Sequence, residues 1–377
     1  MNIQLVIQSL VLARGGAERF SRNLIRGLID RGHAITVYCH EWDSRAEQLG
    51  ARLVAVPAGR PGRHPWYEFS RNVAAVMTDE PAADVVFGLT QVLPQDVHRL
   101  GGGIYRYWYK RKYGRLFPLQ LLRPRVSSAL RFEQEMYQLK NLRHAIAISA
   151  MDRNLLVRHT SLPPERVHIV YNGFDFVEFN PGGRSEARET LCSRYGIDPD
   201  KTIVLFAANN YIRKGLPQAI DSLRATASPD AFHLLVIGRA KPSLQLRLKA
   251  RSGNAFSSLW LDRVDNPADF YRAADIFLFP TQYDSFANVI GEALLCGLPV
   301  ITTAQAGGAE MIVHDHNGYV VPDYRSIAEM AVCLDLLRDT HRRADFSARA
   351  SEKISACSLA LCAEQTEQIL LRANQEK

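Results

Sequence analysis

Two carboxylates lie eight positions apart in the segment ADIFLFPTQYDSFANVIGEALLCGLPVITT (274–303). The apolar run that ends at Pro280 predicts a buried strand, the polar TQYDSFAN predicts a loop, and a helix is expected to begin near Asn288. Asp284 then lies in the loop and Glu292 in the helix. Carboxylates there can accept hydrogen bonds from the vicinal hydroxyls of a ribose or sugar ring, while N–H groups at the helix start face phosphate oxygens. The alternative is that Asp284 caps the helix and Glu292 lies on the surface.

Two adjacent cations, Arg213 and Lys214, stand in FAANNYIRKGLPQAIDSL (206–223), after an expected strand and before an expected helix. A positive charge at the start of a helix opposes the helix dipole, so an anionic ligand would account for the pair. A diphosphate that gains negative charge as a glycosidic bond breaks is such an anion, because Arg offers a planar fork and Lys a compact charge. A solvent-exposed basic turn is the alternative.

A glycine turn, ARGGAER (13–19), lies between the first expected strand and the first expected helix. It is not a GxGxxG motif and no P-loop lysine follows, so the pattern does not favour a dinucleotide or ATP site. Glycine lets the backbone approach a ligand closely. Gly15 and Gly16 are therefore candidates for a ligand contact, and a plain tight turn is the alternative.

No motif predicts a metal ion or an organic cofactor. Asp198-Pro199-Asp200 has D-x-D spelling, but it reads as an ordinary polar turn before a strand. The six cysteines form no CxxC pair and no Cys/His cluster with zinc spacing, which is typical of reduced core residues. We therefore expect a protein that needs neither metal nor cofactor.

Strands and helices alternate along the chain. This alternation implies parallel strands with crossover helices, and thus an α/β fold of two Rossmann-like, doubly wound domains that face a cleft. The polar stretch 175–200 marks the junction, so we expect domains at 1–174 and 175–357, with a terminal helix in 358–377 crossing back to the first domain. The expected strands lie at 3–10, 33–40, 51–57, 83–89, 144–149, 201–209, 232–238, 274–280 and 299–303.

Basic residues gather in one segment. Between Ile104 and Arg131 there are eight Lys and Arg and no Asp or Glu, and removing these eight from the net charge of +7 leaves about −1 for the rest of the chain. Tyr and Trp alternate with these cations, and the combination suits an anionic membrane surface, at roughly 1 kcal/mol per cation. A solvent-exposed face and nucleic-acid binding are the alternatives, although no nucleic-acid module accompanies the segment. The expected membrane contacts are Tyr105, Arg106, Trp108, Lys110, Arg111, Lys112 and Arg115.

The apolar run at residues 3–10 has no basic residue before it and no small-residue cleavage site after it, so it does not read as a signal peptide. A membrane-spanning helix needs roughly 20 apolar residues, and no such stretch occurs. A buried first strand is the preferred interpretation. Together with the scattered cysteines, it predicts a cytoplasmic protein.

The segment 284–300 resembles the E-x7-E signature of the family 4 glycosyltransferases, roughly E-x-F-G-x-V-x-x-E-A-x-x-x-G-x-P-V. It departs at two positions, because Asp284 replaces the first Glu and Ala287 replaces the glycine. The R-K-G and G-G-A-E-R motifs and the stretches 169–181 and 306–321 are also similar to that family, so the resemblance runs from residue 3 to about 330. The matching residues in the signature are Phe286, Val289, Glu292, Ala293, Gly297, Pro299 and Val300.

The resemblance implies the GT-B fold and a retaining, metal-independent transfer from a nucleotide sugar, with the donor on the second domain and the acceptor on the first. It implies that Glu292 binds the nucleotide ribose, that Asp284 contacts hydroxyls of the transferred sugar, and that the phosphates lie against the backbone of 287–289. The implied donor-binding residues are Gly15, Gly16, Ala287, Asn288, Val289 and Glu292, and the implied catalytic residues are Arg213, Lys214 and Asp284.

The basic segment and GLTQVLPQDV (88–97) are similar to enzymes that add glucose to the inner core of bacterial lipopolysaccharide. That similarity implies UDP-glucose as donor, a lipid-linked glycan as acceptor and a peripheral place at the cytoplasmic face of the inner membrane, with no nucleic-acid partner. Family members often carry an acceptor-side histidine where this chain has glycines; Asp96 is the acceptor-site candidate here, and a helix-surface acid is its alternative. The competing functions are a GT-B sugar-nucleotide epimerase and a non-catalytic protein that binds membranes or nucleic acid.

Overall fold

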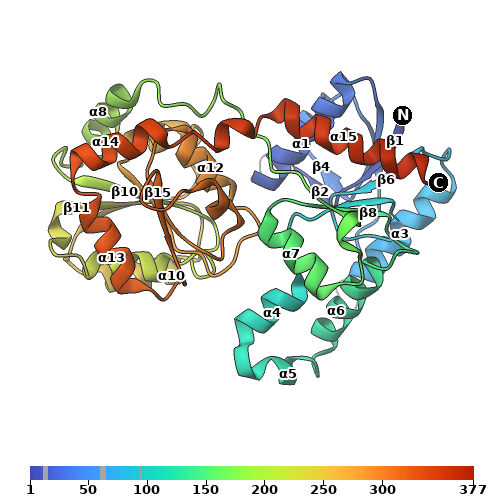
Figure 1. The fold of residues 1–377 in the computed structure, drawn as a ribbon, viewed down its shortest axis with the longest axis horizontal. Coiled ribbons are helices and arrows are strands. Elements are labelled where there is room, and N and C mark those ends of the chain that lie inside the picture. The colour runs from blue at the N-terminus through green and yellow to red at the C-terminus, as the bar shows by residue number, and fades with distance from the viewer. Residues whose placement is uncertain (12–15, 60–64, 94) are drawn as a thin grey trace. The chain divides into compact units, whose positions relative to one another are not determined.

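The computed structural model describes residues 1–11, 16–59, 65–93 and 95–377. The chain divides into two compact units: unit 1 comprises Met1–Gly173 and Ser358–Lys377, and unit 2 comprises Phe174–Cys357. Each unit is built on a parallel sheet with helices on its faces (Figure 1). The α/β class predicted from the alternation of strands and helices is confirmed.

The sheet of unit 1 has the strand order β5-β3-β1-β6-β7-β8-β9, and all of its neighbouring strands pair in parallel. The chain moves outward from β1 to β5, returns to β6 beside β1, and continues to β9, which is the doubly wound topology. A separate pair joins β2 (Ser9–Leu10) and β4 (Glu41–Trp42). The strands of the sheet are β1 (Asn2–Val6), β3 (Ala34–Cys39), β5 (Arg52–Ala55), β6 (Val85–Gly88), β7 (Val97–Arg99), β8 (His144–Ala147) and β9 (Val167–Ile169).

The C-terminal helix α15 (Leu359–Gln375) packs against α1 (Gly16–Asp30) within unit 1. Apolar residues of both helices share one core cluster with β1 and β3, because Leu24, Leu28 and Leu370 are all buried there. Glu367 reinforces the contact through an ion pair with Arg31 and a hydrogen bond with His33. The other helices on this sheet are α2 (Ser44–Glu47), α3 (Pro65–Thr78), α7 (Ala150–His159) and the 3₁₀ turn η2 (Pro164–Arg166).

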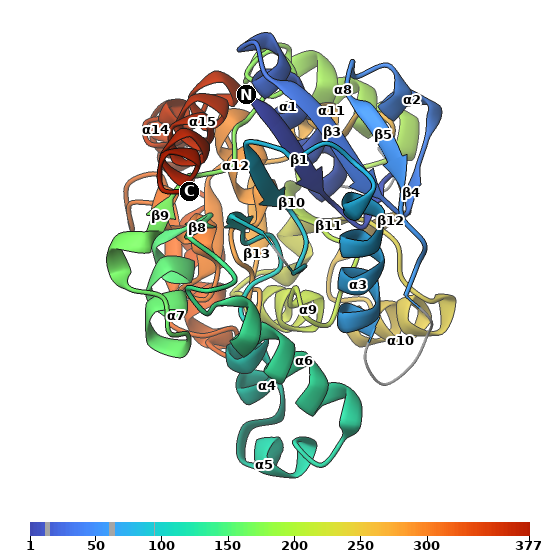
Figure 2. The ribbon, with the colours of Figure 1, turned by 90° about the vertical axis from the view of Figure 1, so that its right-hand side faces the viewer.

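Three helices extend away from the sheet of unit 1, as both views show (Figures 1 and 2). They are α4 (Tyr105–Tyr113), α5 (Phe117–Gln120) and α6 (Pro124–Met136), with the 3₁₀ turn η1 (Gly114–Leu116) between the first two. They enclose a small core of their own, in which the i, i+4 face of α4 covers Phe117, Val126 and Leu130. Glu133 of α6 is buried, and its two side-chain oxygens accept the backbone N–H groups of Tyr105 and Arg106, so this side chain caps the N-terminus of α4.

The sheet of unit 2 has the strand order β12-β11-β10-β13-β14-β15, again parallel throughout. The chain moves outward from β10 to β12 and then returns to β13 on the other side of β10. The direction therefore reverses between β10 and β13, and doubly wound sheets bind ligands beyond the carboxyl ends of the strands at such a reversal. The strands are β10 (Thr202–Ala207), β11 (Phe232–Ile237), β12 (Ser257–Leu261), β13 (Ile276–Phe279), β14 (Val300–Thr303) and β15 (Gly318–Val321).

The helices of unit 2 follow the strands as crossovers. Two of them matter most for the site: α9 (Leu216–Arg224) follows β10, and α12 (Asn288–Leu295) follows β13. The others are α8 (Arg184–Tyr195), α10 (Pro242–Ser252), α11 (Pro267–Ala273), α13 (Ile327–Leu336) and α14 (Thr340–Arg349), with 3₁₀ turns η3 (Pro229–Ala231), η4 (Gly307–Met311) and η5 (Ile354–Ala356).

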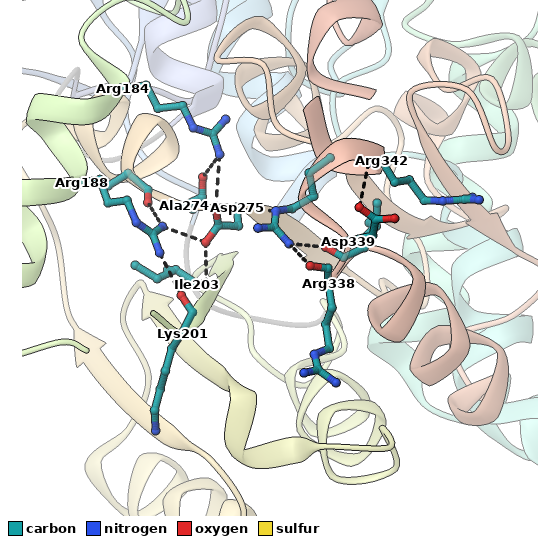
Figure 3. Close-up of polar contacts among 12 residues, drawn as sticks. Arg184, Arg188, Lys201, Ile203, Ala274, Asp275, Arg338, Asp339 and Arg342 are labelled. Carbon is teal, nitrogen blue, oxygen red and sulfur yellow. Dashed lines mark hydrogen bonds and ion pairs between the residues drawn. The ribbon is translucent and has the colours of Figure 1, made fainter. Parts of the chain in front are cut away.

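A buried carboxylate holds the amino edge of this sheet together (Figure 3). Asp275, which precedes β13, accepts the N–H of Ile203 at 2.8 Å and pairs with Arg188 at 2.8 Å. Arg184 and Arg343 approach the same carboxylate at 3.4 and 3.8 Å. These contacts join α8 and α14 to the strands at the edge opposite the carboxyl ends, so they serve the fold and not a ligand at those ends.

Candidate functional site

Two loops meet at the carboxyl ends of β10 and β13, where the strand order of unit 2 reverses. Gln282 donates its N–H to the carbonyl of Arg213 at 2.9 Å, and Thr281 donates its hydroxyl to the same oxygen at 3.2 Å. Gly215 has φ +86°, and a Cβ atom there would lie 1.9 Å from the carbonyl oxygen of Pro280. Only glycine combines this backbone conformation with this close approach, so the glycine of R-K-G is required for the two loops to touch.

The two predicted cations reach across this junction. The Arg213 guanidinium donates from Nη1 to the carbonyl of Tyr283 at 2.9 Å. The Lys214 ammonium forms an ion pair with the Asp284 carboxylate, and both side chains are mostly buried, at 14% and 15% exposure. Lys214 Nζ also lies 5.4 Å from the centre of the Phe279 ring. The structure therefore brings the adjacent cations Arg213 and Lys214 against a loop that follows about seventy positions later in the sequence.

The electrostatics of this cluster favour an anion. Burial, together with the neighbouring charge of Arg213, lowers the pKa of Lys214, and burial also lowers the pKa of Arg213. The Asp284 carboxylate acts in the opposite direction and favours the charged ammonium. Only Lys214 pairs with the carboxylate, since Arg213 donates to a carbonyl. With Lys214 protonated, these three side chains carry a net charge of +1 in a mostly buried place. An anionic group bound there would offset that charge.

Asp284 is held at both its backbone and its side chain. Its N–H donates to Gln305 at 3.0 Å and its carbonyl accepts from Gly307 at 2.9 Å, which ties the loop to the segment after β14. Its Oδ1 accepts the N–H of Ala287 at 3.1 Å. The capping contact considered from the sequence is therefore present, and it coexists with the ion pair to Lys214. Both carboxylate oxygens have fixed directions as a result.

Ala287 takes the left-handed conformation, with φ 67° and ψ 79°, just before α12. This explains the glycine that the family signature has at this position, since left-handed backbone costs an alanine roughly 1 kcal/mol. Asn288 and Val289 are the first two residues of α12 and are half-buried. The N–H of Ala287 donates to Asp284 Oδ1. The phosphate contact expected at 287–289, at the start of this helix, stays a prediction.

Glu292 lies in the second turn of α12 and is half-buried, so it is not the exposed side chain of the alternative interpretation. Its Oε2 accepts the hydroxyl of Tyr271 of α11 at 2.8 Å. A helical side chain is directed back toward the N-terminus of its helix, which places the Glu292 carboxylate toward the loop end of α12. Tyr271 was not predicted from the sequence, because a tyrosine next to Phe270 in a short helix reads as core.

Three predicted site residues belong to unit 1, and the structure describes two of them. Gly15 lies outside the described residues, and Gly16 is the first residue of α1, of which only the backbone is described. Asp96 lies at the amino end of β7, where its carboxylate accepts the N–H of Val86 and pairs with Arg143 and Lys377. Because acceptors of doubly wound domains bind beyond the carboxyl ends, this position corrects the assignment. Asp96 is neither an acceptor contact nor a helix-surface acid but a link between strands and the C-terminus.

The predicted membrane contacts lie on α4 and η1, with one correction. Tyr105 turns inward onto the small helical core and accepts a hydrogen bond from the Trp66 indole at 3.2 Å, so it does not face a membrane. Lys110, Lys112 and Arg115 are exposed, whereas Arg106, Trp108 and Arg111 are half-buried. The sequence analysis missed four exposed leucines that follow directly: Leu116, Leu119, Leu121 and Leu122, at 59%, 60%, 42% and 81% exposure.

The part of the chain that the structure describes contains no group of three or more His, Cys, Asp or Glu arranged to hold a metal ion. All six cysteines are described, and each is buried and free of disulfide bonds. Among the described residues, no helix has both the length and the apolar character that crossing a membrane requires.

Comparison with known proteins identifies the family of each half of the chain. The family model described as Glycosyltransferase Family 4 matches residues 14–178, and the model described as Glycosyl transferases group 1 matches residues 201–339. A D-inositol 3-phosphate glycosyltransferase from Xylanimonas cellulosilytica is 34% identical over 207 residues, which are 52% of this chain and 48% of that protein. The chain thus spans about half the length of this relative.

The lipopolysaccharide glucosyltransferase WaaG from Escherichia coli is 23% identical over 321 residues, or 82% of each chain. A crystal structure of WaaG superposes with a TM-score of 0.82 at 22% identity, covering 98% of this chain and 99% of the other. HepE from Anabaena, solved in complex with UDP and glucose, gives 0.76 at 19% identity, with coverage of 98% and 99%. One family model matches each unit and the fold is GT-B, so the chain belongs to the family 4 glycosyltransferases.

Proposed function

We propose that this protein is a retaining glycosyltransferase that transfers a hexose, glucose from UDP-glucose, to a lipid-linked glycan such as the lipopolysaccharide core. The observation that carries the proposal is the buried cluster of Arg213, Lys214 and Asp284 at the point where the strand order of unit 2 reverses. The similarity to WaaG over 82% of both chains and to the UDP and glucose complex of HepE supports the donor and the acceptor class.

Each residue has a role in this proposal that follows from its chemistry. The diphosphate lies against the helix start at 287–289 and the two cations, which offset the charge that develops as the bond to the sugar breaks. Asp284 accepts hydrogen bonds from hydroxyls of the transferred sugar, and Glu292 accepts those of the ribose. The acceptor attacks on the face that the diphosphate leaves, and the leaving phosphate takes the acceptor proton. The role of a protein general base is then filled by the donor itself, and no step is assigned to a metal.

We also propose that the α4–η1–α5 tip of unit 1 docks on the anionic cytoplasmic face of the inner membrane. Lys110, Lys112 and Arg115 supply exposed positive charge, and each cation contributes about 1 kcal/mol near an anionic surface. Three leucines in the following segment, Leu116, Leu119 and Leu122, are 59%, 60% and 81% exposed. Burial of apolar side chains in the headgroup boundary adds to the electrostatic attraction.

The enzymatic proposal is tested by measuring UDP release from a panel of nucleotide sugars, with and without acceptor. We expect release from UDP-glucose to rise when truncated lipopolysaccharide core is added, and the anomeric configuration of the product to match that of the donor. Stimulation by inositol 3-phosphate in place of the glycan would reject the proposed acceptor. Conversion of the sugar nucleotide without any acceptor would favour the epimerase.

The membrane proposal is tested by vesicle flotation of the full chain. Binding to vesicles that contain phosphatidylglycerol is expected. Each buried leucine contributes roughly 1.5 kcal/mol, or about 10-fold, so replacing Leu116, Leu119 and Leu122 together by Ser should weaken binding on the order of 1000-fold. Leu246→Ser, at a leucine of unit 2 that is 68% exposed, is the control and should bind normally. Equal binding of all variants, or of neutral and anionic vesicles, would contradict the proposed surface.

A further inference from the structure

A buried tyrosine lies behind the proposed ribose-binding carboxylate. Tyr271 of α11 is 2% exposed, and its hydroxyl donates to Glu292 Oε2 at 2.8 Å. The ring is packed between two other aromatic rings, with its centroid 6.0 Å from that of Phe179 and 5.7 Å from that of Phe277. Since edge and tilted ring contacts restrict rotation about both side-chain torsions, the hydroxyl has one direction in space.

This arrangement has consequences for Glu292. A glutamate has three side-chain torsions, and an unanchored one samples several rotamers. A carboxylate accepts up to about four hydrogen bonds, so the bond from Tyr271 is compatible with acceptance from two vicinal hydroxyls. A donor fixed within the core therefore holds the acceptor oxygens in place before the ligand arrives, and this lowers the ordering cost of binding.

We propose that Tyr271 is a positioning residue that orients Glu292 toward the two ribose hydroxyls of the nucleotide, an inference that rests on the proposed role of Glu292. Tyr271 touches neither the sugar nor the diphosphate in this scheme. Its contribution is uniform binding of the nucleotide, equal in the ground state and the transition state. Loss of its hydroxyl should raise KM for the nucleotide sugar and leave kcat nearly unchanged.

The experiment compares UDP with 2′,3′-dideoxy-UDP, which lacks both ribose hydroxyls, by calorimetric titration of the full-length protein. For the native protein we expect the dissociation constant of dideoxy-UDP to exceed that of UDP by a factor of about 10 or more, because the ribose hydroxyls of UDP form hydrogen bonds to a charged carboxylate. Glu292→Ala should reduce this ratio to about 1, and Tyr271→Phe should reduce it by about 5-fold while the affinity for dideoxy-UDP stays constant.

A matched control is available in the same unit. Tyr319 is 3% exposed, and its hydroxyl bonds to Asp315 at 3.0 Å and to Arg342 at 2.8 Å, so Tyr319→Phe removes an equally buried hydroxyl with no link to Glu292. It should leave the ratio unchanged. If Tyr271→Phe weakens both nucleotides equally, or neither, the positioning role is overturned while the role of Glu292 stands. If Glu292→Ala leaves the ratio intact, the proposed ribose contact itself fails, and the inference with it.

Discussion

Gly215→Ala should damage the donor site through the backbone alone. The added Cβ would lie 1.9 Å from the carbonyl oxygen and 2.6 Å from the carbonyl carbon of Pro280, so the loop after β10 must move away from the loop after β13. The left-handed conformation costs an alanine roughly 1 kcal/mol, and overpacking adds about 1–3 kcal/mol. We expect a loss of about 2–4 kcal/mol in the free energy of unfolding of unit 2. Arg213 and Lys214, which contact the second loop, should be displaced together.

Gly183→Ala separates the two contributions. Gly183 precedes α8 with φ +74° and ψ 18°, nearly the conformation that Gly215 has before α9, but no atom lies within 4 Å of an added Cβ. Its cost should be only the conformational one, about 1 kcal/mol. Urea denaturation gives both values, and UDP titration should show weakened binding for Gly215→Ala alone. Equal stability and equal UDP affinity of the two variants would refute the argument that close contact of the loops builds the site.

Two predictions concern the scaffold. Asp275→Ala leaves three arginines without their shared carboxylate, so the free energy of unfolding should fall by about 3–5 kcal/mol in urea denaturation. The folded variant should bind UDP normally, and a loss of stability below about 1 kcal/mol would contradict the structural role. Burial raises the pKa of Glu133 from 4.5 to about 7, although the N–H groups of Tyr105 and Arg106 act in the opposite direction. Protonated Glu133 therefore contributes fully to the free energy of unfolding below pH 4.5, and this contribution, about 3 kcal/mol, is lost as the pH rises through 7. Glu133→Gln should therefore flatten the decline in urea stability between pH 4.5 and 8, and an unchanged slope would exclude Glu133 as its source.

Much of unit 2 follows from the sequence because its core strands are continuous apolar runs. The residues of β10 and β11 are buried throughout, as expected for a parallel sheet covered on both faces, and runs of that kind are distinctive. Strand β12 escaped prediction because SSLWL is half-polar and lies at the sheet edge. The short β7 escaped because three residues carry no periodicity.

The site shows where sequence reasoning stops. The cations and carboxylates could be named from motifs. The pairing of Lys214 with Asp284, however, depends on β10 and β13 being neighbours in the sheet, and the order of strands in a sheet is not written in the sequence of either strand. The left-handed backbone at Ala287 is invisible in a sequence with alanine there. Asp96 was misjudged because nothing in its local pattern says at which end of β7 it lies. Tyr105 was misjudged although its i, i+4 spacing with Tyr109 and Tyr113 already indicated one inward face.

The proposed binding of the diphosphate by Arg213 and Lys214 is tested most directly by comparing the affinities of the protein for UDP and UMP. For the native protein we expect UDP to bind about 10-fold or more tightly than UMP, because the second phosphate gains charge-assisted hydrogen bonds. Lys214→Met should reduce that ratio to about 2 or less without changing the affinity for UMP, whereas Asp284→Asn, which breaks the ion pair but keeps the cation, should preserve the ratio. A Lys214→Met protein that is folded and still prefers UDP as the native protein does would contradict the assignment.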